Sequence, residues 1–175
     1  DVYPQELATV APWPVIGNHD AISSDSPTQT GPFFAMFSLP AGAEAGGVGS
    51  GTEAYFSHDS GELHLVQLDS ADSDLTPGSP MLTWLATDLA ANTRPWTIVA
   101  FHHPPYTKGT HDSDDPADSG GILQRMRQNV VPILEAHGVD LVLDTEGAMK
   151  EIAETGDGPR EQIASMGCSI KWKAA

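Results

Sequence analysis

The chain has 175 residues, the size of a single domain with a buried core, and 39% of them are hydrophobic. It carries 24 acidic and 8 basic residues, a formal net charge of −16, which argues against nucleic acid and anionic membranes as partners. No run approaches the roughly 20 apolar residues of a membrane span. The single cysteine, Cys168, excludes an intrachain disulfide. Many aspartates and few lysines favour a secreted, periplasmic or otherwise extracellular protein.

Residues 14–16 are a short apolar run, which predicts a buried strand that ends at Gly17. Glycine permits a tight turn at this point, and the turn presents Asn18, His19 and Asp20. Asn18 offers a carbonyl oxygen and His19 an imidazole, which the Asp20 carboxylate is suited to orient. These are also ordinary turn residues, so the segment alone leaves a polar turn and a functional site both open.

Residues 21–53 have the Ser, Gly and Pro content of a long loop, interrupted by an aromatic cluster at 33–37 that we expect to hold the loop on the core. Two β-rich runs, 54–57 and 63–68, predict a hairpin with a glycine-bearing loop. The aspartates that follow lack the glycine and distal glutamate of an EF-hand, which favours a solvated acidic loop over a calcium site. They are Asp69, Asp72 and Asp74.

Two helices are expected in the second half of the chain. Ser79 is a predicted N-cap, with a proline at the first helical position and a stop near Asn92. Residues 122–134 have the spacing of an amphipathic helix, which Pro132 should break into two pieces.

Strands alternate with these helices. Residues 96–101 are continuously apolar and predict a strand buried on both faces, and residues 139–143 predict another. A last strand is expected within 163–172. Alternation of apolar strands and helices indicates an α/β fold with right-handed crossovers.

Polar residues follow several predicted strands. His102 and His103 follow one, Asp144 follows the next, and Asn18 follows the first. If these strands are neighbours, their carboxyl ends meet at one edge of the sheet. An amide oxygen, imidazoles and nearby carboxylates suit Zn, Mn or Fe. Strand-end histidines are also common hydrogen-bonded turn residues, so the residues alone leave a metal site and a structural turn open.

Four motifs in this order resemble the calcineurin-like metallophosphoesterases, in particular the purple acid phosphatase-like enzymes. They are Gly17-Asn18-His19-Asp20, Leu68-Asp69-Ser70, Phe101-His102-His103-Pro104-Pro105-Tyr106 and Gly138-Val139-Asp140-Leu141-Val142-Leu143. Over residues 14–143 the resemblance implies an α/β fold of metallophosphoesterase type, a two-sheet sandwich flanked by helices. It also implies a metal-dependent phosphoric ester hydrolase of the acid phosphatase or phosphodiesterase kind. In such enzymes two divalent or trivalent ions (Fe, Zn or Mn) activate a bridging hydroxide for in-line attack on phosphorus.

The resemblance implies a role for each matching residue. Asn18 and His102 match two ligands of the same metal ion. His19 matches a catalytic residue that hydrogen-bonds the phosphate and the leaving group, with Asp20 orienting it. Two further histidines lie where the family has substrate-contacting or purely structural ones: His103 and His111.

The chain also departs from the family. The family's Asp-x-His and Gly-Asp metal motifs are absent from the residues before Gly17, and residues 144–148 replace its Gly-His-x-His motif, with Glu146 and Ala148 where histidines belong. We therefore expect a single domain over residues 1–175 that is incomplete at its N-terminal side, with 144–175 unassigned. Little phosphatase activity is expected from the isolated chain, because two neutral ligands hold metal weakly.

Three interpretations remain. The chain is part of a phosphate ester hydrolase whose other ligands lie elsewhere, a non-catalytic binding or structural module that has lost its metals, or a single-metal site with Glu146 or Asp69 as a replacement ligand. In each case a partner chain or a missing segment is expected to cover the exposed edge of the sheet.

Overall fold

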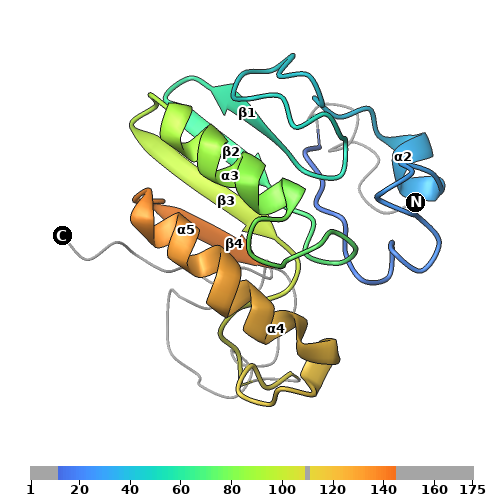
Figure 1. The fold of residues 1–175 in the computed structure, drawn as a ribbon. Helices are drawn as coiled ribbons and strands as arrows, with labels where there is room; N and C mark the ends of the chain where they lie inside the picture. Colours follow the sequence, from blue (N-terminus) through green and yellow to red (C-terminus); the bar gives the residue numbers. More distant parts are fainter. Residues whose placement is uncertain (1–11, 109–110, 145–175) are drawn as a thin grey trace, which may run out of the picture.

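The structure, a computed structural model, describes residues 12–108 and 111–144. It confirms the α/β class, with a mixed sheet in the order β1-β2-β3-β4 (Figure 1). β1 (Phe56–Ser60) pairs antiparallel with β2 (Leu63–Gln67), and β3 (Trp96–Phe101) and β4 (Leu141–Asp144) continue the sheet in parallel. A second sheet, as in the implied sandwich, is not among the elements described, and the strand expected within 163–172 lies outside these ranges.

Helices connect the parallel strands. α3 (Pro80–Ala91) joins β2 to β3, and a helical stretch of three pieces joins β3 to β4 (Figure 1). The pieces are α4 (Ile122–Arg125), the π-helical η2 (Met126–Val130) and α5 (Val131–Ala136). Two short helices lie in loops, α2 (Pro32–Met36) and the 3-10 turn η1 (Asp118–Gly121). Within the described ranges, no helix is both long and apolar enough to cross a membrane.

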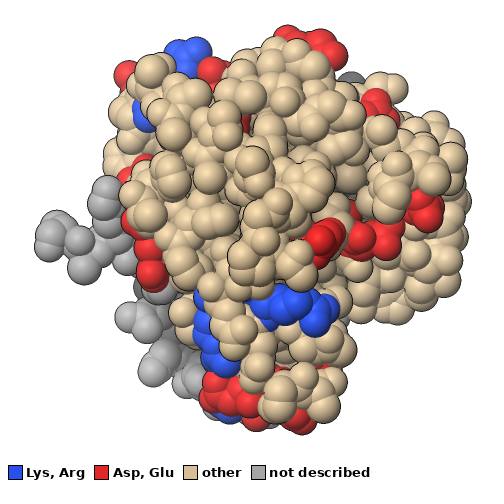
Figure 2. All heavy atoms as spheres, in the orientation of Figure 1, with Lys and Arg blue, Asp and Glu red and all other residues tan. Residues whose placement is uncertain are grey.

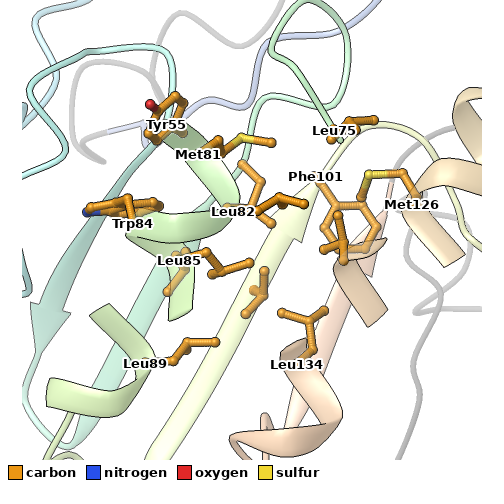
Figure 3. Packing of buried hydrophobic residues seen from close by; sticks show 14 of the residues in the cluster. Tyr55, Leu75, Met81, Leu82, Trp84, Leu85, Leu89, Phe101, Met126 and Leu134 are labelled. Atoms are coloured by element: carbon orange, nitrogen blue, oxygen red, sulfur yellow. The ribbon is translucent and has the colours of Figure 1, made fainter. Parts of the chain in front are cut away.

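The main core lies between one face of the sheet and these helices. Val66 of β2 and both Val99 and Phe101 of β3 are fully buried against side chains of α3, η2 and α5 (Figure 3). The alternate residues of β3, Ile98 and Ala100, are only half-buried. The prediction of a strand buried on both faces is therefore wrong, because the helices described here cover one face of the sheet.

The bounds of α3 follow the sequence prediction. Ser79 is the N-cap, Pro80 occupies the first turn and Asn92 is the C-cap. The Ser79 hydroxyl makes no capping hydrogen bond, although its carbonyl accepts the Thr83 N–H at 2.9 Å. Proline at the first position, whose missing N–H needs no partner there, is therefore the local signal that starts this helix.

The break expected at Pro132 is also present. The π-helical turn η2 precedes it, and Pro132 sits in the first turn of α5. Proline has no N–H for a carbonyl four residues earlier and its ring crowds that carbonyl. A widened turn relieves both effects while Met126 and Val130 stay fully buried.

A smaller core lies where the N-terminal segment meets β1. Ile16, Phe33, Leu39 and Phe56 are buried together, with Phe34 and Phe37 against them. This confirms that the aromatic cluster holds the long loop on the core. Residues 14–16 are not a strand of the sheet described here, so that prediction is wrong. Two prolines, at 12 and 14, remove backbone donors from this short stretch.

The hairpin is tighter than predicted. His58 and Asp59 belong to β1, and the connection is the two-residue turn Gly61-Glu62. Gly61 has a φ of 60°, the sign that favoured two-residue hairpin turns require. The acidic loop after β2 also differs from expectation, because Asp69 is fully buried instead of solvated.

Residues 45–48, the glycine-rich segment, lie unusually close to the sheet. A Cβ at Gly47 would fall 2.0 Å from the Ser57 hydroxyl, and one at Gly46 would fall 2.8 Å from the Asp59 carboxylate. By contrast, a Cβ at Gly51 would meet nothing within 4 Å. Gly47 and Gly51 share the same backbone conformation, with φ of 74° and 76°.

This pair of glycines gives a matched test of the packing. Gly51→Ala should lower the free energy of unfolding by about 1 kcal/mol, the cost of a side chain at positive φ. Gly47→Ala should cost about 1–3 kcal/mol more, because the methyl group also overlaps Ser57. Urea unfolding followed by circular dichroism measures both, and equal losses would contradict this close approach.

Candidate functional site

Asn18 and His102, 84 residues apart in sequence, come together at the carboxyl end of β3. Asn18 Oδ1 lies 3.1 Å from His102 Nε2. Asn18 is exposed and His102 is half-buried, so both atoms are placed at the surface of this edge. The convergence expected from the sequence is present even though residues 14–16 are not a strand.

Gly17 makes this approach possible. A Cβ at Gly17 would lie 3.2 Å from His102 Nδ1, so a side chain there would push the imidazole away. The Gly17 N–H donates to Asp20 Oδ2 at 3.0 Å, and the Asp20 carbonyl accepts the Ser24 N–H at 2.9 Å. Asp20 thus closes the turn that presents Asn18.

His103 points away from His102 and into the protein. The two rings meet edge to face with centroids 4.8 Å apart. Ser70 Oγ accepts the His103 backbone N–H at 3.0 Å and lies 3.0 Å from His103 Nδ1. Burial, with a smaller effect of His102, lowers the pKa of His103 to about 4. The low pKa favours a neutral His103 ring, which is hydrogen-bonded to the Ser70 hydroxyl through Nδ1.

Asp69 precedes Ser70 and shapes the same turn. Its Oδ1 accepts the N–H groups of Ala71 and Asp72 at 2.9 and 3.0 Å, and its Oδ2 accepts the Ser73 hydroxyl at 2.8 Å. Both carboxylate oxygens hold the turn that follows β2. This arrangement argues against Asp69 as a replacement metal ligand.

His111 belongs to the loop between β3 and α4. Its Nδ1 lies 2.7 Å from Asp118 Oδ1 and 3.2 Å from the Ser119 hydroxyl. Asp118 Oδ2 accepts the Asp112 N–H at 2.6 Å. That backbone hydrogen bond, together with the one to His111, lowers the pKa of Asp118 to about 2. Asp118 is thus a fixed anion that orients the His111 ring.

Basic side chains gather beside this loop. Among the described residues the Lys and Arg side chains are Arg94, Lys108, Arg125 and Arg127, and three of them lie in the loop after β3 or in the helix that follows. Figure 2 shows basic atoms gathered beside acidic ones on the lower part of the face in view. Lys108 and Arg127 bind Asp114 at 2.8 Å, and the Arg127 guanidinium lies 5.6 Å from the centre of the Tyr106 ring.

The Asn18 and His102 atoms fit two adjacent ligands of one ion. Atoms 3.1 Å apart are close enough to bind one ion together. An amide oxygen and an imidazole nitrogen suit Zn, Mn or Fe. The described part of the chain contains no group of three or more His, Cys, Asp or Glu side chains that could hold a metal. The remaining ligands would have to come from residues outside the described ranges.

Comparison with known proteins identifies the family. The family model for calcineurin-like phosphoesterases matches residues 3–143. The chain belongs to this family. It is 28% identical over 142 residues to purple acid phosphatase 23 of Arabidopsis thaliana, covering 79% of this chain and 28% of that protein. A solved purple acid phosphatase from yellow lupin aligns over 75% of this chain and 24% of its own, with 15% identity and a TM-score of 0.48.

In this calcineurin-like phosphoesterase chain, the structure gives some of the predicted site residues defined contacts and leaves the roles of the others untested. It brings Asn18 and His102 together, gives His103 a buried partner and fixes His111 on Asp118. His19 is exposed in the turn beside Asn18. The roles of His19 and Asp20 in catalysis stay predictions, as does substrate binding by His103 and His111. Glu146 and Ala148 lie outside the described residues.

Two residues of the site were missed as contributors. Ser70 lies three residues after the end of β2, level with His103 after β3, and parallel pairing of the two strands was the signal that could have connected them. Asp118 is seven residues from His111 in an aspartate-rich loop, and nothing in the sequence distinguishes it from its neighbours Asp112, Asp114 and Asp115.

Removal of the Ser70 hydroxyl should destabilise the fold. Ser70→Ala leaves a buried backbone N–H and His103 Nδ1 without their partner, at a cost of about 1–3 kcal/mol in unfolding free energy. Urea unfolding at pH 7 measures this loss. Ser60→Ala, at an exposed position, is the control and should stay within about 0.5 kcal/mol of the parent. Equal effects would contradict the buried Ser70–His103 bond.

Asp118 should titrate far below an ordinary aspartate. Carbon NMR of its carboxyl group should give a midpoint of about 2 in the folded chain and about 3.9 in urea. Because the folded pKa is the lower one, this carboxylate stabilises the fold above about pH 4 and loses that effect as the pH falls toward 2. Asp118→Asn should flatten the stability profile over this window, and an unchanged profile would refute the contribution.

Proposed function

We propose that this chain contributes to a metal-dependent phosphoric ester hydrolase of the acid phosphatase or phosphodiesterase kind. The observation that carries the proposal is the 3.1 Å approach of Asn18 Oδ1 and His102 Nε2 in a chain that belongs to the calcineurin-like phosphoesterases. The chain spans 28% of the length of the purple acid phosphatase it matches, so activity and substrate are inferred from the site.

In this proposal Asn18 and His102 hold one metal ion. Bound ions would neutralise the phosphate ester and supply the nucleophile for in-line displacement. His19, exposed beside Asn18, would donate a hydrogen bond to the phosphate or the leaving group. Asp20 would act by fixing the turn that carries Asn18 and His19, through the hydrogen bond from the Gly17 N–H.

The substrate proposal depends on local charge. In a chain of net charge −16, bound metal ions are the groups that would draw an anionic ester to this edge, because Lys108 and Arg127 are already paired with Asp114. His103 is a weaker candidate for substrate contact, because its ring is 2% exposed and bound to Ser70. A secreted or periplasmic location is proposed on composition alone.

A non-catalytic binding or structural module is the second candidate. The observation that favours it is the lack of a cluster of three metal-binding side chains within the described residues. Asn18 and His102 would then be a hydrogen-bonded pair that ties the N-terminal segment to the sheet, with His102 donating to the Asn18 oxygen.

Metal binding and hydrolysis separate the two candidates. Under the first candidate, the purified source protein that supplies the remaining ligands should bind Zn, Mn or Fe and hydrolyse p-nitrophenyl phosphate, measured by elemental analysis and by release of nitrophenol. His102→Ala should reduce both the metal content and the rate, the rate by at least about 100-fold. His137→Ala, an exposed histidine at the end of α5, is the matched control and should change neither.

The outcomes are distinct. Unchanged turnover in His102→Ala would defeat the assignment of His102 as a ligand. If the protein takes up no metal when Zn, Mn and Fe are each supplied at a saturating concentration, the non-catalytic module is favoured.

A further inference from the structure

A buried charge cluster lies at the amino end of β2, the opposite end of the strand from the candidate metal site. His64 is 1% exposed. Its Nδ1 lies 2.9 Å from Asp59 Oδ1, and its Nε2 lies 2.8 Å from Asp88 Oδ2. A carboxylate oxygen only accepts hydrogen bonds, whereas a neutral imidazole has one N–H to donate. Both contacts are satisfied together when the ring carries two protons.

We propose that His64 is a buried imidazolium clamp that holds the glycine-rich segment 45–48 on the sheet, and that loss of one ring proton releases this segment. The proposal concerns a conformational switch controlled by pH. It is independent of the metal site and of phosphoester hydrolysis.

The clamp reaches the segment through Asp88. Asp88 Oδ2 faces His64, while Oδ1 accepts the Val48 N–H at 2.7 Å and the Ser57 hydroxyl at 2.8 Å. The Val48 carbonyl in turn accepts the Trp84 Nε1–H at 2.7 Å. Asp88 is therefore oriented by the imidazolium on one side and by the segment on the other.

Asp59 makes the second connection. Its backbone N–H donates to the Ala45 carbonyl at 2.9 Å, and its side chain lies against Gly46. Asp59 Oδ2 also accepts Arg94 Nε–H at 3.1 Å. The segment is thus held at both of its ends by residues that contact His64.

The charges of the cluster balance only when His64 is protonated. Two carboxylates, Asp59 and Asp88, face one guanidinium from Arg94 and the imidazolium. Loss of the ring proton leaves an excess negative charge in a buried site. It also makes one ring nitrogen a hydrogen-bond acceptor that faces a carboxylate oxygen, which is an acceptor too. Within the described ranges, His58 is a further titratable neighbour of His64; its side chain lies on the face of β1 opposite to that of Asp59 and stacks on Trp13 with ring centroids 3.9 Å apart.

Burial and hydrogen bonding act in opposite directions on these two histidines. Burial alone would lower the pKa of His64, but hydrogen bonds to Asp88 and Asp59 raise it above the ordinary value. Burial lowers the pKa of His58. A group whose folded pKa is raised stabilises the fold below its unfolded pKa and loses that effect as pH rises through the folded value. The segment should therefore be held below the ordinary histidine pKa of about 6.5 and loosened as the pH rises through the raised pKa of His64.

Nitrogen NMR of the imidazole side chains tests the protonation state in the unmodified chain. At pH 6.5, the ordinary pKa of histidine, His64 should show mainly the two similar ring-nitrogen shifts of an imidazolium, because its pKa is raised, whereas His58, whose pKa is lowered, should show mainly the split shifts of a neutral ring. A neutral His64 at this pH would overturn the proposal. This measurement needs no variant, so it stands even if a substitution prevents folding.

Hydrogen exchange tests the release of the segment. Protection factors, corrected for the intrinsic effect of pH, should fall at least about tenfold for the Val48 amide between pH 6 and the alkaline limb of the His64 titration. The Leu68 amide, which donates to Ala100 within the sheet, should keep its protection. Constant protection at Val48 while His64 loses its proton would refute the coupling.

Two matched variants separate the clamp from a general effect of histidine. His64→Gln cannot carry the charge and should make Val48 protection low and independent of pH. His58→Gln, on the same strand pair but the opposite face, should leave the pH dependence of Val48 intact. Retention of the pH dependence in His64→Gln would assign the effect to another group and overturn the proposal.

Discussion

In the parallel ladder of this sheet, Gln67 of β2 lies opposite Ala100 of β3, which lies opposite Leu143 of β4. That register brings the carboxyl ends of β2, β3 and β4 to one edge of the sheet, so the polar residues that follow these strands lie side by side there. A shift of one residue would exchange the buried Val99 with the half-buried Ala100 and move the following histidines to the wrong faces. The burial of the core therefore fixes the positions of the site residues.

The alternation of a strand continues past the end of β3 and separates the two histidines by function. His102 falls on the half-buried side, where it meets Asn18, and His103 falls on the core side, where Ser70 accepts its N–H. The buried histidine anchors the turn that carries the accessible one. The pair thus combines a half-buried histidine at the Asn18 contact with a buried histidine that supports the turn, and the register decides which histidine takes which position.

Sequence reasoning succeeded where the deciding forces are local. Pro80 and Asn92 bound α3 as expected, and the break at Pro132 follows from the missing proline N–H. It failed at residues 14–16, where an apolar run has no strand partner among the described residues. The Asn18–His102 contact was expected from the family resemblance and from strand-end geometry. The cluster around His64 was not predicted, because it depends on Asp88. The sequence pattern of the helix indicates only that Asp88 belongs to α3, not that its carboxylate faces His64.

The acidic composition has a structural explanation that also limits the chemistry of the site. Asp20, Asp69, Asp88 and Asp118 each accept at least one backbone N–H, so these carboxylates are committed to turns, a loop and the clamp. Asn18 and His102 are neutral as metal ligands. A metal ion held by them alone would lack the charge compensation that carboxylate ligands supply. A stable metal site at this edge therefore requires anionic ligands from beyond the described residues. Whether those ligands are present, more than the position of Asn18 and His102, decides between a hydrolase and a binding module.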